Sequence, residues 1–135
     1  ETQVTIPLIS SDLCDLLLAV SEGRLSDSMP TFSNAHALTV VLAAEGYPGP
    51  PAKGRLIGGN ASSKWVEMGE GKCLIHHAGT GLDDGKLIST GGRVLAATGV
   101  SEISLQDAKN LAYKRLSEVE LEGSHFRRDI GHRAL

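Results

Sequence analysis

Aromatic residues are scarce in this chain of 135 residues, which has one tryptophan, two tyrosines and two phenylalanines. A hydrophobic core must therefore be built from aliphatic side chains. Long apolar runs are lacking as well, because a run such as Leu38 to Ala44 is far too short to span a bilayer. No signal-peptide pattern opens the chain. We expect no membrane partner.

A block of lysine and arginine is also missing, and the formal net charge is −3. This balance argues against nucleic acid or an anionic membrane as the main partner. The two cysteines, Cys14 and Cys73, form no Cys-x-x-Cys pair. Their unlike surroundings favour buried free thiols in a reducing compartment over a disulfide, so we expect a cytoplasmic protein.

Common catalytic and cofactor motifs are absent from the sequence. No Walker loop, dinucleotide fingerprint, Gly-x-Ser-x-Gly elbow or His-Glu-x-x-His pair occurs. His76 and His77 are adjacent, and on a strand adjacent side chains point to opposite faces. We expect one to be packed and the other exposed, and assign neither metal ligands nor catalytic residues to this chain.

The first part of the chain predicts a strand and a helix that need a partner surface. Thr2 to Ile9 is rich in β-formers. Ser10 to Asp12 offers N-cap oxygens for a helix over Ser11–Glu22, with Gly23 as its C′ residue. One face of that helix is apolar, through Leu13, Leu16, Leu17 and Val20. A short amphipathic helix cannot bury such a stripe alone.

After a polar connector at residues 26–34, the remainder predicts several strands followed by one helix. The apolar run from Ala35 to Ala44 predicts a strand buried on both faces. Ser104 is a candidate N-cap for a helix, and apolar residues continue at helical spacing as far as Val119. Gly123 is expected to end this helix. Shorter strands are expected at 55–57, 72–78 and 93–100. Together these elements predict a soluble domain of mixed α/β class.

The stretch from His76 to Leu95 carries the most specific signals. Asp84-Gly85 between two short β-type runs predicts a type I′ hairpin. Glycines at both arms allow another group to approach the backbone closely: they are Gly79, Gly81, Gly91 and Gly92. Arg93 heads the following strand and suits a phosphate or carboxylate. The alternative is that Arg93 pairs with an acidic residue such as Asp129 or Glu102.

The C-terminal tail concentrates charge at Arg127, Arg128, Asp129 and Arg133. These residues form either an anion site or a solvated tail in which arginine pairs with aspartate.

Three motifs carry a resemblance to a known family: YPGPPAKGRLIGG, HHAGTGLDDGKLISTGGRVL and RRDIGHRAL. In this order and spacing they resemble the C-terminal domain of glycinamide ribonucleotide synthetase, of the ATP-grasp superfamily. The opening Glu-Thr-Gln is similar to the end of a family stretch ending Gly-Asp-Pro-Glu-Thr-Gln. Since the chain begins at Glu1 without an initiator methionine, we expect it to be a piece of something longer.

The resemblance implies a fold, a domain division and an activity. The fold is a mixed, largely antiparallel sheet with one long amphipathic helix, preceded by the last strand and helix of the ATP-grasp domain. Residues 1–28 would be the tail of that domain and 29–135 the C-terminal domain. The implied enzyme is an ATP-dependent carbon–nitrogen ligase of de novo purine synthesis, which joins 5-phosphoribosylamine to glycine.

The implied enzyme activates the glycine carboxylate as an acyl phosphate, with ATP and magnesium or manganese. By the resemblance, the nucleotide lobes and metal ligands lie upstream of Glu1, so we expect this segment alone to be inactive and to bind no cofactor. Its partners would be the upstream domains and the two substrates. Matching motif positions imply substrate contacts at Arg93, Gly91, Gly92, His77, Gly79, Thr80, Arg128 and Asp129. The alternative function is a free-standing module that kept the fold and binds a small molecule or protein.

Overall fold

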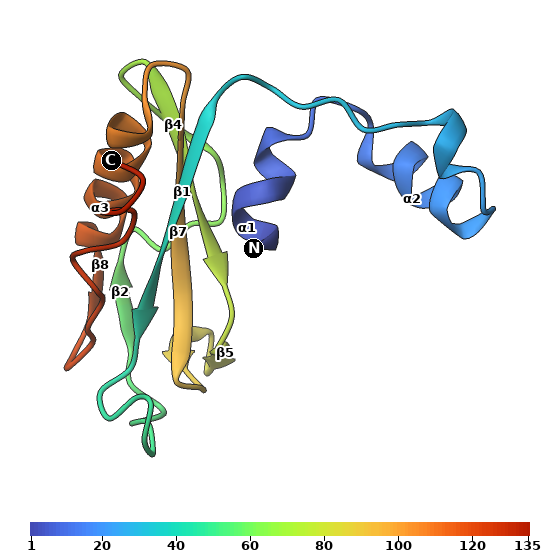
Figure 1. The fold of residues 1–135 in the computed structure, drawn as a ribbon. Helices are drawn as coiled ribbons and strands as arrows, with labels where there is room; N and C mark the ends of the chain where they lie inside the picture. The colour runs from blue at the N-terminus through green and yellow to red at the C-terminus, as the bar shows by residue number, and fades with distance from the viewer.

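The computed structural model describes all residues, 1–135, as an antiparallel sheet with one long helix and an arm at the N-terminal end (Figure 1). The helices are α1 Thr2–Thr5, α2 Leu13–Ser21 and α3 Leu105–Ser117, with 3₁₀ turns η1 Ile6–Leu8 and η2 Leu25–Asp27. The strands are β1 His36–Ala43, β2 Ile57–Gly59, β3 Val66–Met68, β4 Gly71–His77, β5 Thr80–Asp83, β6 Lys86–Ser89, β7 Arg93–Ser101 and β8 Val119–Leu121. None of the helices is long and apolar enough to cross a membrane.

The main sheet has the order β1-β7-β4-β3, with every neighbouring pair antiparallel. Pairing places Val40 and Ile75 on either side of Ala97, so that these side chains share one face. That face packs against α3 and forms a cluster of 13 buried hydrophobic residues, all aliphatic as the sequence predicts. The mixed α/β class and antiparallel sheet are confirmed.

Small residues let α3 lie close to the sheet. A Cβ atom on Gly99, in the central strand β7, would stand 2.1 Å from the carbonyl oxygen of Ala108. Ala108 and Ala112 are themselves 0% exposed. Helix and strand therefore touch backbone to backbone at this point.

The predicted start of α3 is confirmed, but its predicted end is wrong. The Ser104 hydroxyl oxygen accepts a hydrogen bond from the Asp107 N–H at 3.1 Å. The helix ends at Ser117 because the chain then turns into β8, which pairs with β2. Val119, at the helical spacing in the sequence, lies in that strand instead.

The predicted hairpin is confirmed as β5 and β6. Asp84 and Gly85 have φ of 46° and 74°, the positive values that a type I′ turn requires. The strands at 72–78 and 93–100 are confirmed as β4 and β7. The strand predicted at 55–57 lies two residues later, as β2 at Ile57–Gly59, and Leu56 forms only an isolated bridge to Ile88.

The predicted strand over Thr2–Ile9 is wrong. Residues 2–8 form α1 and η1, in which the Glu1 carbonyl accepts hydrogen bonds from the Val4 and Thr5 N–H groups at 2.9 and 3.0 Å. Pro7 sits at the start of η1, where its missing N–H costs nothing. This segment lies along the face of the sheet opposite α3 (Figure 1).

That opposite face is only partly covered, so the prediction that β1 is buried on both faces is wrong. Leu38, Val40 and Leu42 are buried against α3, whereas Val41 is 38% exposed. An apolar run predicts burial of both faces only if something covers the second one. In this chain, α1 and η1 cover part of it.

Helix α2 confirms the predicted helix and lies at the far end of the arm (Figure 1). The Asp12 side chain caps it by accepting from the N–H groups of Cys14 and Asp15, at 2.8 and 3.1 Å. Its apolar residues stay largely outside the core, because Leu17, Leu18 and Val20 are 60%, 50% and 55% exposed.

Both cysteines are free, as predicted, but only one of them is buried. Cys73 lies in β4 at 0% exposure, whereas Cys14 on α2 is exposed. The prediction that both thiols are buried is therefore wrong for Cys14, because α2 lies on an arm away from the sheet and Cys14 is on an exposed side of that helix.

Candidate functional site

The glycines of the central motif bring the two arms of the hairpin region together. Gly79 donates to the Arg93 carbonyl at 2.9 Å, and Thr90 donates to the Gly79 carbonyl at 2.8 Å. A Cβ on Gly79 would stand 2.8 Å from both the Arg93 carbonyl oxygen and the Gly91 Cα. The predicted close approach is present, and the group that approaches is the chain itself.

Gly92 makes room for an aromatic ring. A Cβ there would lie 2.5 Å from a ring carbon of Tyr47. The Ala44 N–H also donates to the Gly92 carbonyl at 2.8 Å, which ties the end of β1 to this turn. Packing therefore accounts for glycine at this position without a ligand.

Arg93 emerges from this turn with an exposed side chain that makes no ion pair or side-chain hydrogen bond. The alternative in which it pairs with Asp129 or Glu102 is wrong. Arg93 lines a hollow of about 400 Å³ between the sheet and the N-terminal segment, together with Glu1, Gln3 and His76. On its other side a hollow of about 240 Å³ lies against Tyr47, Phe126 and Arg127, among others.

His77 and Thr80 are brought together as the motif suggests. His77 Nδ1 lies 3.1 Å from the Thr80 hydroxyl, and its Nε2 lies 2.8 Å from the Ala61 carbonyl oxygen. The side chain of His77 is exposed, whereas His76 is partly buried and bonds Thr98 Oγ1 at 3.0 Å. Burial lowers the pKa of His76. The packed and exposed roles predicted for the two histidines are confirmed.

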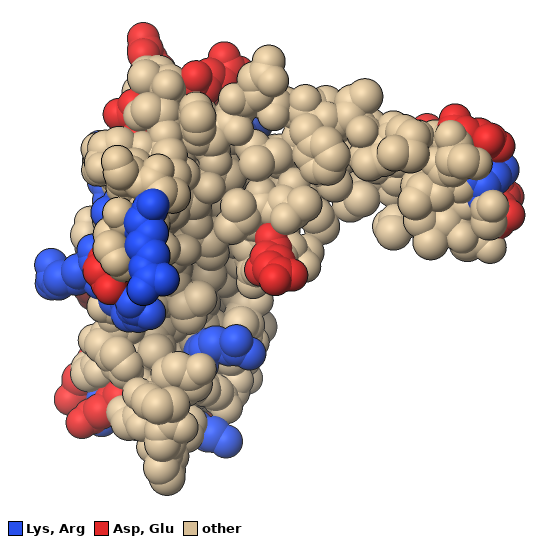
Figure 2. All heavy atoms as spheres, viewed as in Figure 1, with Lys and Arg blue, Asp and Glu red and all other residues tan.

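Arg128 and Asp129 lie apart from this group. Asp129 accepts two hydrogen bonds from Arg127, at 2.9 and 2.6 Å, and they lower its pKa to about 2. The Arg128 guanidinium lies over the Phe126 ring at 5.6 Å. Neither residue lines the hollows beside Arg93, while Arg127 lines one of them. Arginine and lysine side chains gather over α3 and the C-terminal segment (Figure 2).

The C-terminal segment is held in place by α3 and β1. The Tyr113 hydroxyl donates to the Arg127 carbonyl at 2.7 Å, and the Tyr113 and Phe126 rings are 5.7 Å apart. His125 and Ala43 exchange backbone hydrogen bonds of 2.9 and 2.8 Å. These contacts carry Arg127 to the side of Arg93.

Sequence reasoning assigned no role to Tyr47 or Arg115, both of which help to shape this region. Tyr47 had one available signal, as one of only five aromatic residues in the chain. Arg115 had another, because it follows Ala108 and Ala112 along the apolar stripe of α3. No group of three or more His, Cys, Asp or Glu side chains is placed to hold a metal ion.

Comparison with known proteins identifies the family. Residues 37–133 match the family described as phosphoribosylglycinamide synthetase, C domain. The chain is 43% identical over 136 residues to the trifunctional purine biosynthetic protein adenosine-3 of Gallus gallus, covering 100% of this chain and 13% of that protein. It is 38% identical over 136 residues to a phosphoribosylamine–glycine ligase of Synechocystis sp., covering 100% of this chain and 31% of that protein.

A solved structure agrees with these relatives. The crystal structure of phosphoribosylamine–glycine ligase from Thermotoga maritima matches with a TM-score of 0.70 and 34% identity, covering 94% of this chain and 29% of that one. The chain thus spans less than a third of the length of each of these three proteins. It belongs to the phosphoribosylglycinamide synthetase family and corresponds to the C-terminal portion of its members.

Proposed function

We propose that this chain serves as the C-terminal part of a phosphoribosylamine–glycine ligase, which joins 5-phosphoribosylamine to glycine at the expense of ATP. The match over the whole chain supports this function over a free-standing binding module. In this proposal ATP and magnesium or manganese belong to the preceding lobes, as the family resemblance implies. A cytoplasmic location accords with two free cysteines.

The observation that carries the proposal is the unpaired guanidinium of Arg93. An exposed arginine with no intramolecular partner keeps all five donors available for a ligand. Its base is fixed at the head of β7, the central strand, by the backbone bond between Gly79 and Arg93. A planar fork held in this way suits bidentate contact with a substrate phosphate or carboxylate.

The place of Arg93 agrees with this role. It shares a hollow with Glu1, and the resemblance puts the family's metal-holding residues a few positions upstream of Glu1. In this proposal His77 and Thr80 line the edge of the substrate site next to Arg93. Gly79, Gly91 and Gly92 shape the turn that carries Arg93. Arg128 and Asp129 then act at the rim, where Asp129 fixes Arg127.

We also propose that residues 1–28 belong with the preceding domain and 29–135 form the C-terminal domain. Helix α2 supports this division, because it lies on an arm away from the sheet that the rest of the chain builds, and its Leu17 and Leu18 are 60% and 50% exposed (Figure 1). Residues 2–8 are the exception within the segment, since α1 and η1 contact β1. They would join the two domains.

The test is substitution of Arg93 in the complete ligase that contains this chain. Arg93→Ala should lower kcat/KM for phosphoribosylamine or glycine by about ten- to a hundredfold, the value of one charge-assisted contact, with the KM for ATP nearly unchanged. Arg93→Lys should recover only part of the loss. Lys86→Ala is the control, because it removes an exposed cation from the adjacent hairpin. Normal kinetics for all three substrates in Arg93→Ala would refute the role.

A further inference from the structure

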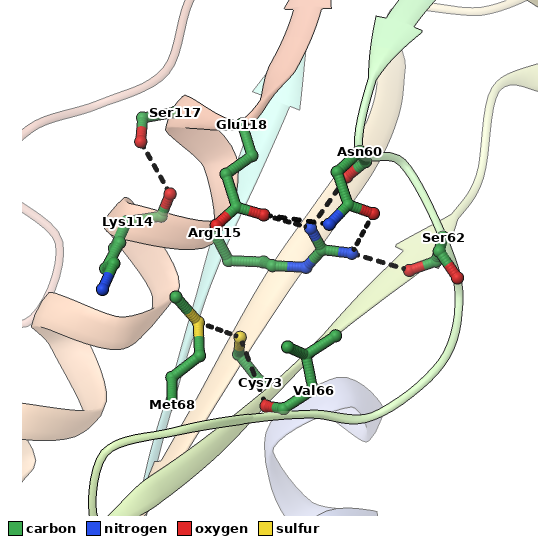
Figure 3. A network of polar contacts seen from close by, with 9 residues as sticks. All are labelled: Asn60, Ser62, Val66, Met68, Cys73, Lys114, Arg115, Ser117 and Glu118. Atoms are coloured by element: carbon green, nitrogen blue, oxygen red, sulfur yellow. Dashed lines mark hydrogen bonds and ion pairs between the residues drawn. The ribbon is translucent and has the colours of Figure 1, made fainter.

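Arg115 is a charged side chain with no exposure to solvent, in the last turn of α3. Its four terminal N–H groups are all used (Figure 3). Nη1 donates to the Asn60 carbonyl at 2.9 Å and to the Glu118 carboxylate at 2.6 Å. Nη2 donates to Asn60 Oδ1 at 3.1 Å and to the Ser62 carbonyl at 3.0 Å.

Three of these four bonds go to one loop, at residues 60–62 after β2. Asn60 is held further by Glu118, because its N–H donates to the Glu118 carbonyl at 2.8 Å and its Nδ2 to the carboxylate at 3.1 Å. Ala61 lies between the two clamped residues and packs against the core. A buried arginine thus fixes the direction of the Ala61 carbonyl.

That carbonyl is the partner of His77. A carbonyl oxygen only accepts, so the 2.8 Å contact requires a proton on His77 Nε2. In the neutral imidazole Nδ1 then carries a lone pair. The Thr80 hydroxyl, 3.1 Å from Nδ1, must donate to it. The single hydroxyl proton of Thr80 is therefore used in the bond to His77. Only the lone pairs of the Thr80 oxygen remain to accept a hydrogen bond from another group.

We propose that Arg115 is a positioning residue which, through Ala61, holds His77 in the Nε2–H tautomer and makes Thr80 an acceptor for a ligand. The ligand group that this site takes is an N–H or O–H donor, such as the amine or a ribose hydroxyl of the substrate, and not a phosphate or carboxylate oxygen. This step rests on the proposed function, in which Thr80 lies at the substrate edge. The two residues then have different roles: Thr80 accepts a hydrogen bond from the substrate, whereas Arg93 donates to its phosphate or carboxylate.

The tautomer is measured directly in the full 135-residue chain labelled with ¹⁵N-histidine. Long-range ¹H–¹⁵N spectra of the unaltered chain at neutral pH should show His77 with Nε2 protonated and Nδ1 bare. A protonated Nδ1, or exchange between tautomers, overturns the proposal whatever the variants do.

The variant is Arg115→Lys, in which one ammonium group replaces the planar fork that bridges Asn60 and Ser62. In the folded variant His77 should lose its single tautomer. Arg55→Lys is the matched control, because Arg55 also bonds a carboxylate and a carbonyl but on a different loop, at Glu45 and Glu122. It should leave the His77 signals unchanged. An intact His77 tautomer in folded Arg115→Lys would mean that Arg115 is only structural.

Kinetics in the complete ligase test the acceptor role. Thr80→Val should lower kcat/KM for phosphoribosylamine about 3- to 10-fold, and Thr80→Ser should restore it. Arg115→Lys should cause a loss of the same kind, and the double variant should be no worse than Thr80→Val alone, because both changes remove one arrangement. If the loss of kcat/KM in the double variant equals the product of the two single losses, the proposal is overturned.

The two proposals fail in different ways. Normal kinetics in Thr80→Val beside impaired Arg93→Ala overturns the acceptor role and leaves the proposed ligase function standing. Normal kinetics in both variants overturns the proposed site as a whole. The spectra decide the positioning role of Arg115 separately from either result.

Discussion

Gly99→Ala should separate α3 from the sheet, and the size of the effect follows from the packing. The new Cβ would stand 2.1 Å from the Ala108 carbonyl oxygen and 2.8 Å from the Ala112 backbone nitrogen, where ordinary contact begins at 3.4 Å. Both neighbours are helix backbone, so no side-chain rotation relieves the clash. The helix must move away by about an ångström.

Such a movement disturbs the whole core. Ala108, Ala112 and Leu116 belong to the 13-residue cluster between α3 and the sheet. Overpacking of this kind costs about 1–3 kcal/mol, and we expect about 3 kcal/mol here because the clash is with backbone. The melting temperature should fall by about 10 °C. Arg115 moves with α3, so the His77 tautomer should be disturbed too.

Urea unfolding followed by circular dichroism measures the change, with Gly58→Ala as the matched control. A Cβ on Gly58 meets the end of the Glu120 side chain at 3.2 Å, and that side chain can move. The control should stay within about 1 kcal/mol of the unaltered chain. If Gly99→Ala loses no more stability than Gly58→Ala, the close helix–strand contact is not as described.

Four further outcomes are expected. The 135-residue chain alone should release no phosphate from ATP with phosphoribosylamine and glycine, and turnover of about 1 per second would contradict this. Because burial lowers the pKa of His76 below 6.5, the unfolded chain binds more protons, so the free energy of unfolding should fall as pH drops through 6.5, and His76→Gln should flatten that slope. Exposed Cys14 should react quickly with a thiol reagent, whereas Cys73, whose pKa burial raises, should react only on unfolding. Leu17→Asp on α2 should leave the chain's own stability unchanged but weaken the complete ligase, as a melting scan of each would show.

The elements that the sequence predicted well are those with local causes. Asp84-Gly85 specifies its turn by two positive φ angles within two residues. Ser104 caps α3 through a neighbour three residues away. His77 and Thr80 meet for the same reason, because a short turn joins β4 to β5. Each of these features is determined by residues that lie within a few positions of one another, so the local sequence is enough to predict it.

The errors arise where a distant segment decides the outcome. Val119 continues the helical spacing, but pairing of β8 with β2, some 60 residues earlier in the chain, takes it into a strand. Thr2 to Ile9 has strand propensity, yet no neighbouring strand is there to pair with it except at Ile9, which bridges Phe32. Strand propensity describes fit to a partner surface, and the sequence does not name the partner.

The candidate site also contains both features that depend on nearby residues and features that depend on distant segments. The Gly79–Gly91 contact follows from a hairpin that the sequence predicts. The contacts of Arg115 could not be predicted from its neighbours in the sequence, because the loop that it holds lies 55 positions earlier, at Asn60. Even so, its place on the apolar stripe of α3 was visible in the sequence. A charged residue on such a stripe must find buried partners for its donors or destabilise the fold. Arg115 meets most of that requirement, because its four terminal N–H groups all have partners, while its Nε is buried without one. The loop that supplies three of these partners also supplies the carbonyl that contacts His77. An arginine on an apolar helix face is therefore a reason to look for the segment that it positions.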